Sequence, residues 1–413
     1  MRFLSKNDPQ IHNLINQELN RQKNGLVMIA SENFTSPAVL EAMASVLSNK
    51  YAEGYPQNRY YSGNEHIDDI ESLAIDRAKK LFKAEYVNVQ PHSGTSANLA
   101  SYLAILNPGD KILSMNLTHG GHLSHGSKAS IVSKLYNIIH YNVDPQTHLI
   151  DYDQVRKIAL QEKPKLIISG TSSYPRQIDF AQINNIAKEI NAYHLADISH
   201  IAGLCLAKQH PDPIANADII TTTTHKTLRG PRSAIILAKK ELGKKIDKAV
   251  FPGIQGGPLQ HVIAAKATCF AEAMTEKYIN DQIQTIKNAQ SLAETLKANG
   301  IKLITNGTDT HLILIDLRPL NLTGKKAADL LAQTNIYTNF NVIPYDTCAI
   351  SNPSGLRLGT PALTTQGLKE QEMQIIGQAI SDLLKNPNNN KLGDNTKLLV
   401  NDLTKQFPIY SQI

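Results

Sequence analysis

A lysine directly after a β-branched run is the first sign of chemistry in the sequence. Lys226 follows Ile219, a second isoleucine, four threonines and His225, and a Gly-Pro pair at 230–231 interrupts what comes next. Ligands bind where the strands of α/β sheets end, and a partly desolvated amine beside cations such as Arg232 or His225 has a lowered pKa. We therefore expect Lys226 to react as a Schiff-base lysine. Taken alone, a surface lysine after a strand is the simpler interpretation.

A carboxylate stands in a comparable position 29 residues earlier. Asp197 follows the strand expected at 194–196, and His200 comes three residues later. An enzyme that uses pyridoxal phosphate needs a carboxylate beside the pyridine nitrogen, because the negative charge keeps that nitrogen protonated and makes the ring an electron sink. The spacing to Lys226 corresponds to about one strand–helix–strand unit. An ordinary helix N-cap is the alternative for Asp197.

Small hydroxyl-bearing residues form a turn between an expected strand and a helix. Ser93, Gly94 and Thr95 lie where that helix begins, so free backbone N–H groups and the positive end of the helix dipole would favour an anion. The serine and threonine hydroxyls add donors. We expect this turn to hold a phosphate group without a Walker lysine, although simple helix capping would explain the same residues.

Three histidines at a spacing of three, His119, His122 and His125, raise the question of a metal site. Gly120 and Gly121 argue against a regular helix that would align the rings, and no acidic residue lies within the motif. A metal is therefore the weaker interpretation. We expect a flat imidazole from this segment to stack on an aromatic cofactor ring instead.

Two further groups suit an amino-acid substrate. Arg357 lies among small and apolar residues, so it should be partly buried and in need of an anionic partner. A bidentate arginine suits a substrate α-carboxylate, and a structural ion pair is the alternative. Tyr51, Glu53 and Tyr61 are interleaved with glycines and suit substrate positioning and acid–base work, unless they only pack a loop. Together, these features supply the parts that one pyridoxal-phosphate enzyme needs.

The composition narrows the function classes. The chain has 413 residues, of which 41% are hydrophobic and 19% charged, and its 42 basic residues against 36 acidic ones occur in short pairs. A nucleic-acid-binding stripe is therefore not indicated. Cys205, Cys269 and Cys348 form no CxxC motif, which favours free thiols in a reducing compartment. With no signal-peptide pattern and no apolar run of about 18 residues, we expect a cytoplasmic protein.

Alternating strand and helix patterns from about 86 to 237 predict an α/β fold with a mostly parallel sheet. Strands are expected at 86–89, 111–113, 166–168, 194–196, 219–222, 234–237, 311–317 and 355–358. Helices are expected at 96–105, 181–190, 325–332 and 368–384, with a long helical region at 259–298 closed by Asn299-Gly300. We expect an N-terminal helical arm at 1–24, a large domain at 25–276 and a smaller α/β domain at 277–413.

The motifs taken together resemble those of one family. Over about 26–410 the chain is similar to serine hydroxymethyltransferases, which are fold-type I pyridoxal-phosphate enzymes, in the segments YAEGYP, RYY, QPHSG, HGGHLSHG, TTTTHKTLRGPR, QGGP and SGLRLGTPA. The resemblance implies a large domain with a central sheet flanked by helices and a smaller C-terminal domain. It also implies the reversible transfer of the serine hydroxymethyl carbon to tetrahydrofolate, giving glycine and 5,10-methylenetetrahydrofolate.

The resemblance also assigns the cofactor site residue by residue. Around the pyridine ring, it implies that Lys226 bonds to pyridoxal phosphate, Asp197 pairs with the ring nitrogen and His122 stacks on the ring. The contacts to the phenolic oxygen and to the phosphate would come from Ser172, His200, Ser93, Gly94 and Thr95. The residues that the resemblance marks as catalytic are Lys226, Glu53, His122, Asp197, His200, Thr223 and Arg232.

In this family the active site is shared between subunits, so the resemblance implies at least a homodimer and leaves a tetramer open. The partner chain would supply Tyr51, Glu53, Tyr61, Gly256 and Gly257. Glu53 would be the acid–base group near the serine hydroxymethyl and the folate. Arg357, with Ser31, would bind the carboxylate of the amino acid.

The folate site is the part where the sequence departs from the family pattern. The resemblance implies that it is lined by Leu117, Gly121, Leu123, Asn341, Ala349, Ile350 and Ser351. The last three lack the aromatic residue that commonly precedes the arginine motif. A folate-independent pyridoxal-phosphate aldolase or transaldolase acting on β-hydroxy amino acids is therefore the alternative function. A non-catalytic relative is disfavoured because the lysine, aspartate and arginine are all present.

Overall fold

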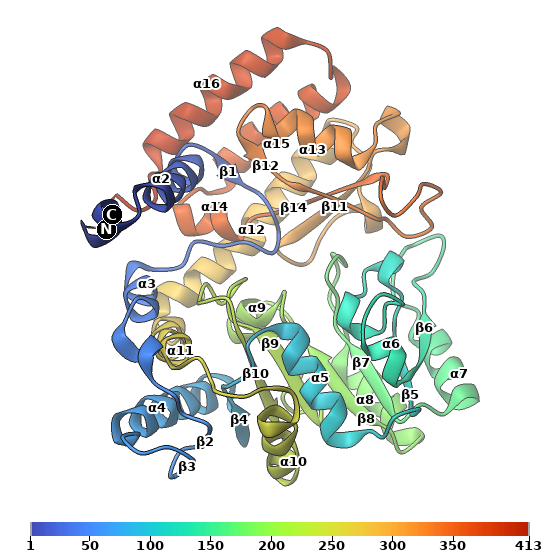
Figure 1. Ribbon diagram of the computed structural model, residues 1–413. Helices are drawn as coiled ribbons and strands as arrows, with labels where there is room; N and C mark the ends of the chain where they lie inside the picture. The colour runs from blue at the N-terminus through green and yellow to red at the C-terminus, as the bar shows by residue number, and fades with distance from the viewer. Residues whose placement is uncertain (1, 412–413) are drawn as a thin grey trace.

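The protein is described by a computed structural model over residues 2–411, and it consists of two lobes, one above the other in Figure 1. The lower lobe is built on a seven-stranded sheet with the order β4-β10-β9-β8-β7-β5-β6. Its strands are β4 (Tyr86–Asn88), β5 (Lys111–Met115), β6 (Asn137–Tyr141), β7 (Leu166–Ser169), β8 (Tyr193–Asp197), β9 (Ile219–Thr223) and β10 (Ala234–Ala238). Only β10 runs against the others, since β4 and β9 are both antiparallel to it and the remaining pairs are parallel. The predicted mostly parallel α/β fold is confirmed.

Helices cover both faces of this sheet. Successive residues of a strand point to opposite faces, so Ile220 and Ile219 of β9 enter two different apolar cores. A sheet buried on both sides favours apolar and β-branched residues along its strands, and this pattern made most of these strands recognisable in the sequence. One core is closed by α3 (Pro37–Met43), α4 (Glu65–Phe82), α7 (Tyr152–Glu162), α8 (Phe180–Glu189), α9 (Ala202–Leu206) and α11 (Gln260–Ala273). The other is closed by α5 (Gly94–Ile105), α6 (Val132–Leu135) and α10 (Gly243–Lys248).

The upper lobe has its own core around a three-stranded antiparallel sheet. The order is β11 (Leu312–Asp316), β14 (Gly355–Gly359), β13 (Asn339–Asn341), and the covering helices are α13 (Gly324–Ala332), α14 (Pro361–Gln366), α15 (Glu370–Lys385) and α16 (Asn390–Gln406). The short strand β1 (Leu26–Val27) pairs with β12 (Ile336–Tyr337), so Leu26 and Met28 enter this core. The division at residues 24/25 and 276/277 stays a prediction, and residues 1, 412 and 413 lie outside the described part.

A single helix joins the two cores. α12 (Glu276–Ala298) buries Tyr278 in the lower lobe and Leu292 in the upper one. The helical region predicted at 259–298 consists of two helices, α11 and α12, which are separated at Thr275, whose hydroxyl caps the Tyr278 N–H at 3.3 Å. The end was predicted correctly: Asn299 is the C-cap, and Gly300 takes the left-handed conformation, with φ +70°.

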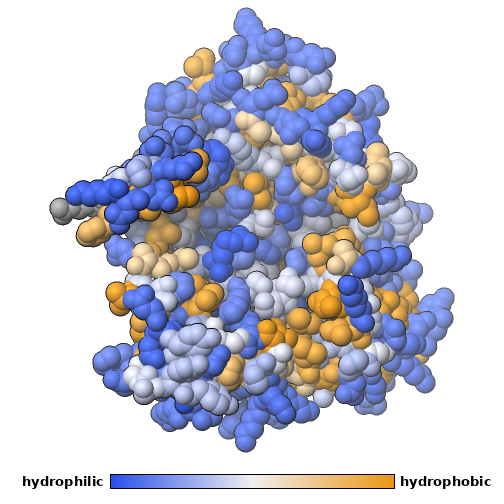
Figure 2. All heavy atoms as spheres, in the orientation of Figure 1, coloured by the Kyte–Doolittle hydropathy of each residue, from blue (hydrophilic) through white to orange (hydrophobic). Residues whose placement is uncertain are grey.

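The N-terminal arm leaves its apolar face uncovered in the single chain. It consists of α1 (Arg2–Asn7) and α2 (Pro9–Lys23), and no residue of α2 is buried. Its side chains Ile11, Leu14 and Ile15 are 45%, 54% and 41% exposed. Figure 2 shows the arm projecting from the body with apolar side chains among polar ones. A face of this kind is typical of a helix that packs against something outside its own chain.

Several elements had too weak a pattern to be predicted. β6 is an edge strand whose Asn137 is exposed, and α4 buries a glutamate, Glu71, which is paired with Arg59 at 2.7 Å. The hairpin of β2 (Gly54–Tyr55) and β3 (Asn58–Arg59) and the polar helix α16 were also missed. Within residues 2–411, no helix has both the length and the apolar character that crossing a membrane would require.

Candidate active site

The predicted reactive residues follow neighbouring strands at one edge of the lower sheet. Asp197 ends β8 and is paired with Thr221 of the parallel strand β9, and Lys226 lies three residues beyond the end of β9. The loops that follow β4, β5 and β7 begin at the same edge, because these strands run in the same direction as β8 and β9. One of these loops approaches very closely, since a Cβ on Gly170, where φ is +131°, would lie 2.2 Å from the Asp197 carbonyl oxygen.

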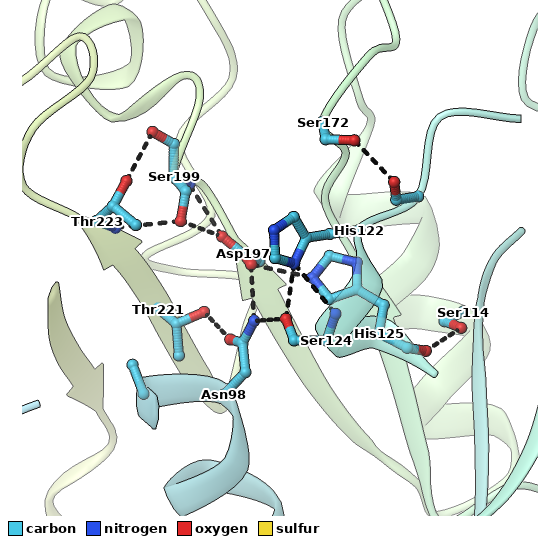
Figure 3. A network of polar contacts seen from close by, with 12 residues as sticks. Asn98, Ser114, His122, Ser124, His125, Ser172, Asp197, Ser199, Thr221 and Thr223 are labelled. Carbon is cyan, nitrogen blue, oxygen red and sulfur yellow. Dashed lines mark hydrogen bonds and ion pairs between the residues drawn. The ribbon is translucent and has the colours of Figure 1, made fainter. Parts of the chain in front are cut away.

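Asp197 is buried at the centre of a polar network (Figure 3). One carboxylate oxygen accepts hydrogen bonds from His125 Nε2 and Asn98 Nδ2, both at 2.9 Å. The other accepts from the Ser199 hydroxyl at 2.6 Å and from its N–H at 3.0 Å. Burial alone would raise the pKa of Asp197, but the contacts with His125, His122 and Asn98 outweigh burial and hold it below its ordinary value. A permanent negative charge is thereby fixed at the end of β8.

His122 lies beside this carboxylate (Figure 3). Its Nδ1 is hydrogen-bonded to the Ser124 hydroxyl at 2.8 Å, which fixes the ring orientation. Burial and the neighbouring His125 lower the pKa of His122 to about 4, so the ring is neutral near pH 7. A flat, neutral imidazole next to an anion can stack on a cationic aromatic ring. Among the described residues, no His, Cys, Asp and Glu cluster suited to a metal ion is present.

Lys226 is buried next to this network. Burial lowers the pKa of Lys226 to about 8; Asp197 opposes the decrease, while Arg357 and the exposed Arg232 add to it. The expectation that His225 supplies a further positive charge is wrong. Burial, Arg232 and Lys226 lower the pKa of His225 to about 3, so its ring carries no charge near neutrality. Within the described chain, no hydrogen bond occupies the Lys226 ammonium, which is free to react.

The lowered pKa predicts how Lys226 reacts with an aldehyde. About one tenth of a lysine with a pKa of about 8 is neutral at pH 7, against less than about one thousandth at the ordinary value of about 10.4. The rate at which cofactor-free protein forms its visible absorbance with pyridoxal phosphate should therefore rise with pH around a midpoint near 8. Lys226→Ala should abolish this component, and a single midpoint near 10 in the unmodified protein would contradict the assignment.

Arg357, on β14, brings the upper lobe to this site. Its Nη1 donates to the Ser172 carbonyl at 2.5 Å and its Nε to Asn339 Oδ1 at 3.1 Å. The side chain is buried, and no carboxylate among residues 2–411 pairs with it. Burial lowers the pKa of Arg357 to about 10, which leaves it charged. The structural ion pair considered above is therefore absent from the described chain, and a buried cation is left facing Lys226.

The segment 28–33 connects Arg357 with Lys226. The Gly359 N–H donates to the Met28 carbonyl at 2.8 Å, and the Asn33 amide donates to the Lys226 carbonyl at 3.1 Å. Ser31 lies between these two anchors. Ser172 is held nearby, since its hydroxyl donates to the Gly121 carbonyl at 2.7 Å.

The turn at 93–95 begins α5, as predicted. Ser93 is the N-cap, and both Ser93 and Thr95 are exposed at the helix N-terminus. A Cβ on Gly94 would meet Thr223 Cγ2 at 2.8 Å, so only glycine allows this close approach of the turn to β9. The turn thus offers hydroxyls and free N–H groups beside the Asp197 network, which suits a phosphate.

Five of the predicted site residues form a separate surface cluster. Tyr51 and Tyr61 rings lie 5.0 Å apart and are 56% and 46% exposed, and Glu53 lies beside Tyr61. Cβ atoms on Gly256 and Gly257 would lie 3.4 Å from Glu53 and 3.3 Å from Tyr51. In the described chain, none of these side chains contacts Lys226, Asp197 or Arg357.

The predicted folate residues lie in two loops and at the end of one strand. Leu117, Gly121 and Leu123 share the His122 loop, where Leu123 is half exposed. Asn341 ends β13 opposite Gly355. The exposed residues Ala349, Ile350 and Ser351 lie in the loop between β13 and β14, which also contains Tyr345. That aromatic ring packs edge-on against His119 at 4.6 Å.

Some residues of the site were missed from the sequence. The hydrogen bonds around Asp197 involve Asn98, Ser124 and Ser199. In the sequence these residues stand within motifs for which other roles were predicted, and nothing else pointed to them. His311 gave no signal at all, since it comes from the upper lobe. Its ring stacks on His200 with the planes 22° apart, and Nε2 lies 3.2 Å from His200 Nδ1. Burial lowers the pKa of both histidines, that of His311 to about 3.

Comparison with known proteins identifies relatives of the chain. A family model described as serine hydroxymethyltransferase matches residues 4–380. The serine hydroxymethyltransferase of Nostoc sp. (strain PCC 7120) is 54% identical over all of this chain and 96% of the relative. That of Synechococcus sp. (strain JA-3-3Ab) is 54% identical over all of this chain and 98% of the relative. That of Prochlorococcus marinus (strain AS9601) is 53% identical, over 98% of this chain and 96% of the relative.

Proposed function

Because the chain belongs to the serine hydroxymethyltransferase family, we propose that the residues around Asp197, Lys226 and Arg357 are its cofactor and substrate site. The protein is a pyridoxal-phosphate-dependent enzyme that reversibly transfers the hydroxymethyl carbon of serine to tetrahydrofolate, giving glycine and 5,10-methylenetetrahydrofolate. The observation that carries the site assignment is the buried Arg357, which lacks a carboxylate within the described chain and faces a lysine of lowered pKa.

The donor set fits pyridoxal phosphate. Lys226 has an unoccupied amine, Asp197 a buried negative charge, and the turn Ser93, Gly94 and Thr95 an exposed helix N-terminus. When bound, the cofactor supplies an aldehyde for Lys226 and a ring that accepts the electrons of the breaking bond. Asp197 would hold a proton on the pyridine nitrogen, and the neutral His122 would cover the ring face. Ser172 and His200 would contact the phenolic oxygen.

The remaining residues act on serine. The Arg357 fork binds its α-carboxylate, with help from Ser31, and so sets the torsion about Cα that aligns the breaking bond with the ring. The carboxylate of Glu53 exchanges a proton at the serine hydroxyl oxygen. Thr223 and Arg232 act through their neighbours, since Thr223 contacts the phosphate turn and Arg232 lowers the pKa of Lys226. Leu117, Gly121, Leu123, Asn341, Ala349, Ile350 and Ser351 would receive the folate.

We place Glu53 in trans, on a homodimer whose two active sites are shared. In the described chain Glu53, Tyr51 and Tyr61 form an exposed cluster without a contact to Lys226, and the apolar face of the N-terminal arm is uncovered. Both features suit an isologous contact between two copies. A cytoplasmic location belongs to the same proposal, and the free thiols of Cys205, Cys269 and Cys348 favour a reducing compartment.

Subunit mixing tests the shared site. Lys226→Ala and Glu53→Gln chains should each be inactive, but after unfolding and refolding together about half of the dimers are mixed, and each mixed dimer has one intact site. Activity should recover to about one quarter of the unmodified level. As a matched control, Lys226→Ala mixed with Asp197→Ala should stay inactive, because both changes affect the same half-site. No recovery in the first mixture would place Glu53 and Lys226 on one chain.

A further inference from the structure

A large cleft lies between the lobes and is lined by none of the residues assigned above. Its volume is about 890 Å³, within the range of small-molecule sites. The lower lobe contributes residues 145–149, between β6 and α7, and the upper lobe contributes 297, 300–303 and 305–306 with Arg318 and Tyr345. Neither the cofactor nor the substrate roles account for this cleft.

The cationic side chains that line the cleft have no acidic side chain among them in the described lining. Lys297, Lys302 and Arg318 line it, and the described lining contains no Asp or Glu. Asp316 lies fully buried behind them and pairs with both Lys302, at 3.0 Å, and Arg318, at 2.8 Å. The single negative charge of Asp316 is therefore shared by two positive charges. Among residues 2–411, the Lys297 ammonium pairs only with the highly exposed Glu294, at 3.2 Å, and an exposed pair of this kind is weak.

The walls of the cleft are fixed before any ligand arrives. Arg176 of the lower lobe donates to the Thr305 carbonyl at 2.6 Å and to Asp309 at 2.7 Å. In the opposite direction, the Tyr345 hydroxyl donates to the Val143 carbonyl at 2.6 Å. These hydrogen bonds between the lobes hold the basic wall of the upper lobe in place. Binding of a ligand in the cleft would therefore lose little conformational entropy.

The lining also contains unusual backbone. Thr305, Tyr345 and His148 have φ of +62°, +56° and +57°, a region that β-branched and bulky side chains rarely adopt. Strain of this kind persists where surrounding contacts enforce it, and it concentrates at binding sites. All three residues line the same cavity as the basic side chains.

We propose that this inter-lobe cleft binds a small organic polyanion that carries several phosphate or carboxylate groups. The ammonium groups of Lys297 and Lys302 keep unused N–H donors, and Arg318 adds fixed positive charge. A bound polyanion would contact residues of both lobes and so link them.

The ring of His148 provides a local reporter. Burial, Lys302 and Arg318 lower the pKa of His148, and Asp316 and Asp144 oppose them only in part. An anion among the lysines would favour the protonated ring, so the pKa of His148 should rise on binding. The proton resonances of His148 in a pH titration measure this directly.

Calorimetry on the holoenzyme with saturating glycine tests the proposal, because the phosphate turn and Arg357 are then occupied. Tripolyphosphate and citrate are titrated separately at low salt. We expect one anion per chain and a binding at least about tenfold weaker in a Lys297→Gln/Lys302→Gln variant. A Lys325→Gln/Lys326→Gln variant removes the same charge from the exposed start of α13 and should bind as the unmodified protein does.

The outcomes are distinct. Binding of tripolyphosphate alone would identify a phosphorylated ligand and binding of citrate alone a polycarboxylate; both support the cleft. Saturable binding of neither anion would overturn the proposal. An equal loss of anion affinity in the two double variants would also overturn the proposal. It would mean that the anion is attracted non-specifically by the net charge of the protein. The same holds if the His148 resonances do not respond to a bound anion.

Discussion

Replacing Asp197 by alanine is expected to lower kcat/KM for folate-dependent serine cleavage by roughly 10²- to 10³-fold or more. Removing one preorganised group that stabilises charge in the transition state costs about 2.7–4 kcal/mol, and each 1.36 kcal/mol is a factor of ten in rate. Without this carboxylate, Lys226 and Arg357 would be the charges left in the site, and nothing would hold a proton on the pyridine nitrogen. Steady-state kinetics with serine and tetrahydrofolate measure the loss.

Two companion variants separate charge from folding. Asp197→Asn keeps the shape and can still accept from Ser199, so it should fold, bind pyridoxal phosphate and yet remain strongly impaired. Asp218→Asn changes a carboxylate at the opposite end of the sheet, beside Lys239, and should leave kcat/KM within about twofold. If Asp197→Asn kept the unmodified kcat/KM, a charge role for Asp197 would be untenable.

Arg357→Lys is expected to raise the KM for serine by about 10- to 150-fold. A lysine keeps the positive charge but loses the planar fork, and one charge-assisted hydrogen bond is worth about 1.5–3 kcal/mol. In the described chain the guanidinium contacts only the neutral acceptors of Ser172 and Asn339. The substrate carboxylate would therefore be its first anionic partner, and the change should weaken glycine binding as well.

The control for this change is an arginine with an ordinary ion pair. Arg156, half exposed, is paired with Glu189 on the surface, and Arg156→Lys should leave KM unchanged. Equilibrium dialysis of glycine against the cofactor-loaded Arg357→Lys protein distinguishes binding from chemistry. A variant that bound glycine normally and lost only kcat would show that Arg357 does not hold the carboxylate.

Local patterns predicted the strands that carry the site and the lysine and aspartate that follow them. Strands that are buried on both faces are rich in apolar and β-branched residues, and ligand-binding residues follow the carboxyl ends of such strands, as Asp197 does at the end of β8 and Lys226 does three residues beyond β9. The same reasoning failed for β6, because an edge strand tolerates polar residues such as Asn137 and so loses the apolar pattern.

Contacts between distant segments could not be predicted in this way. His125 meets Asp197 across 72 residues and His200 meets His311 across 111, and no local spacing encodes either contact. The lack of a carboxylate beside Arg357 is of the same kind, since it depends on which side chains from both lobes surround the guanidinium. The small and apolar residues around Arg357 in the sequence made it a candidate, but only the structure shows which side chains surround its guanidinium.

The shared helix α12 has a thermodynamic consequence for the catalytic geometry. With 23 residues it is about 35 Å long, and its two ends belong to different hydrophobic cores. If one lobe unfolded alone, half of α12 would lose the apolar side chains that it packs against. The two lobes are therefore expected to unfold cooperatively. Helix α12 takes no part in the reaction, but it thereby keeps the Arg357 guanidinium of the upper lobe aligned with the Lys226 amine of the lower lobe.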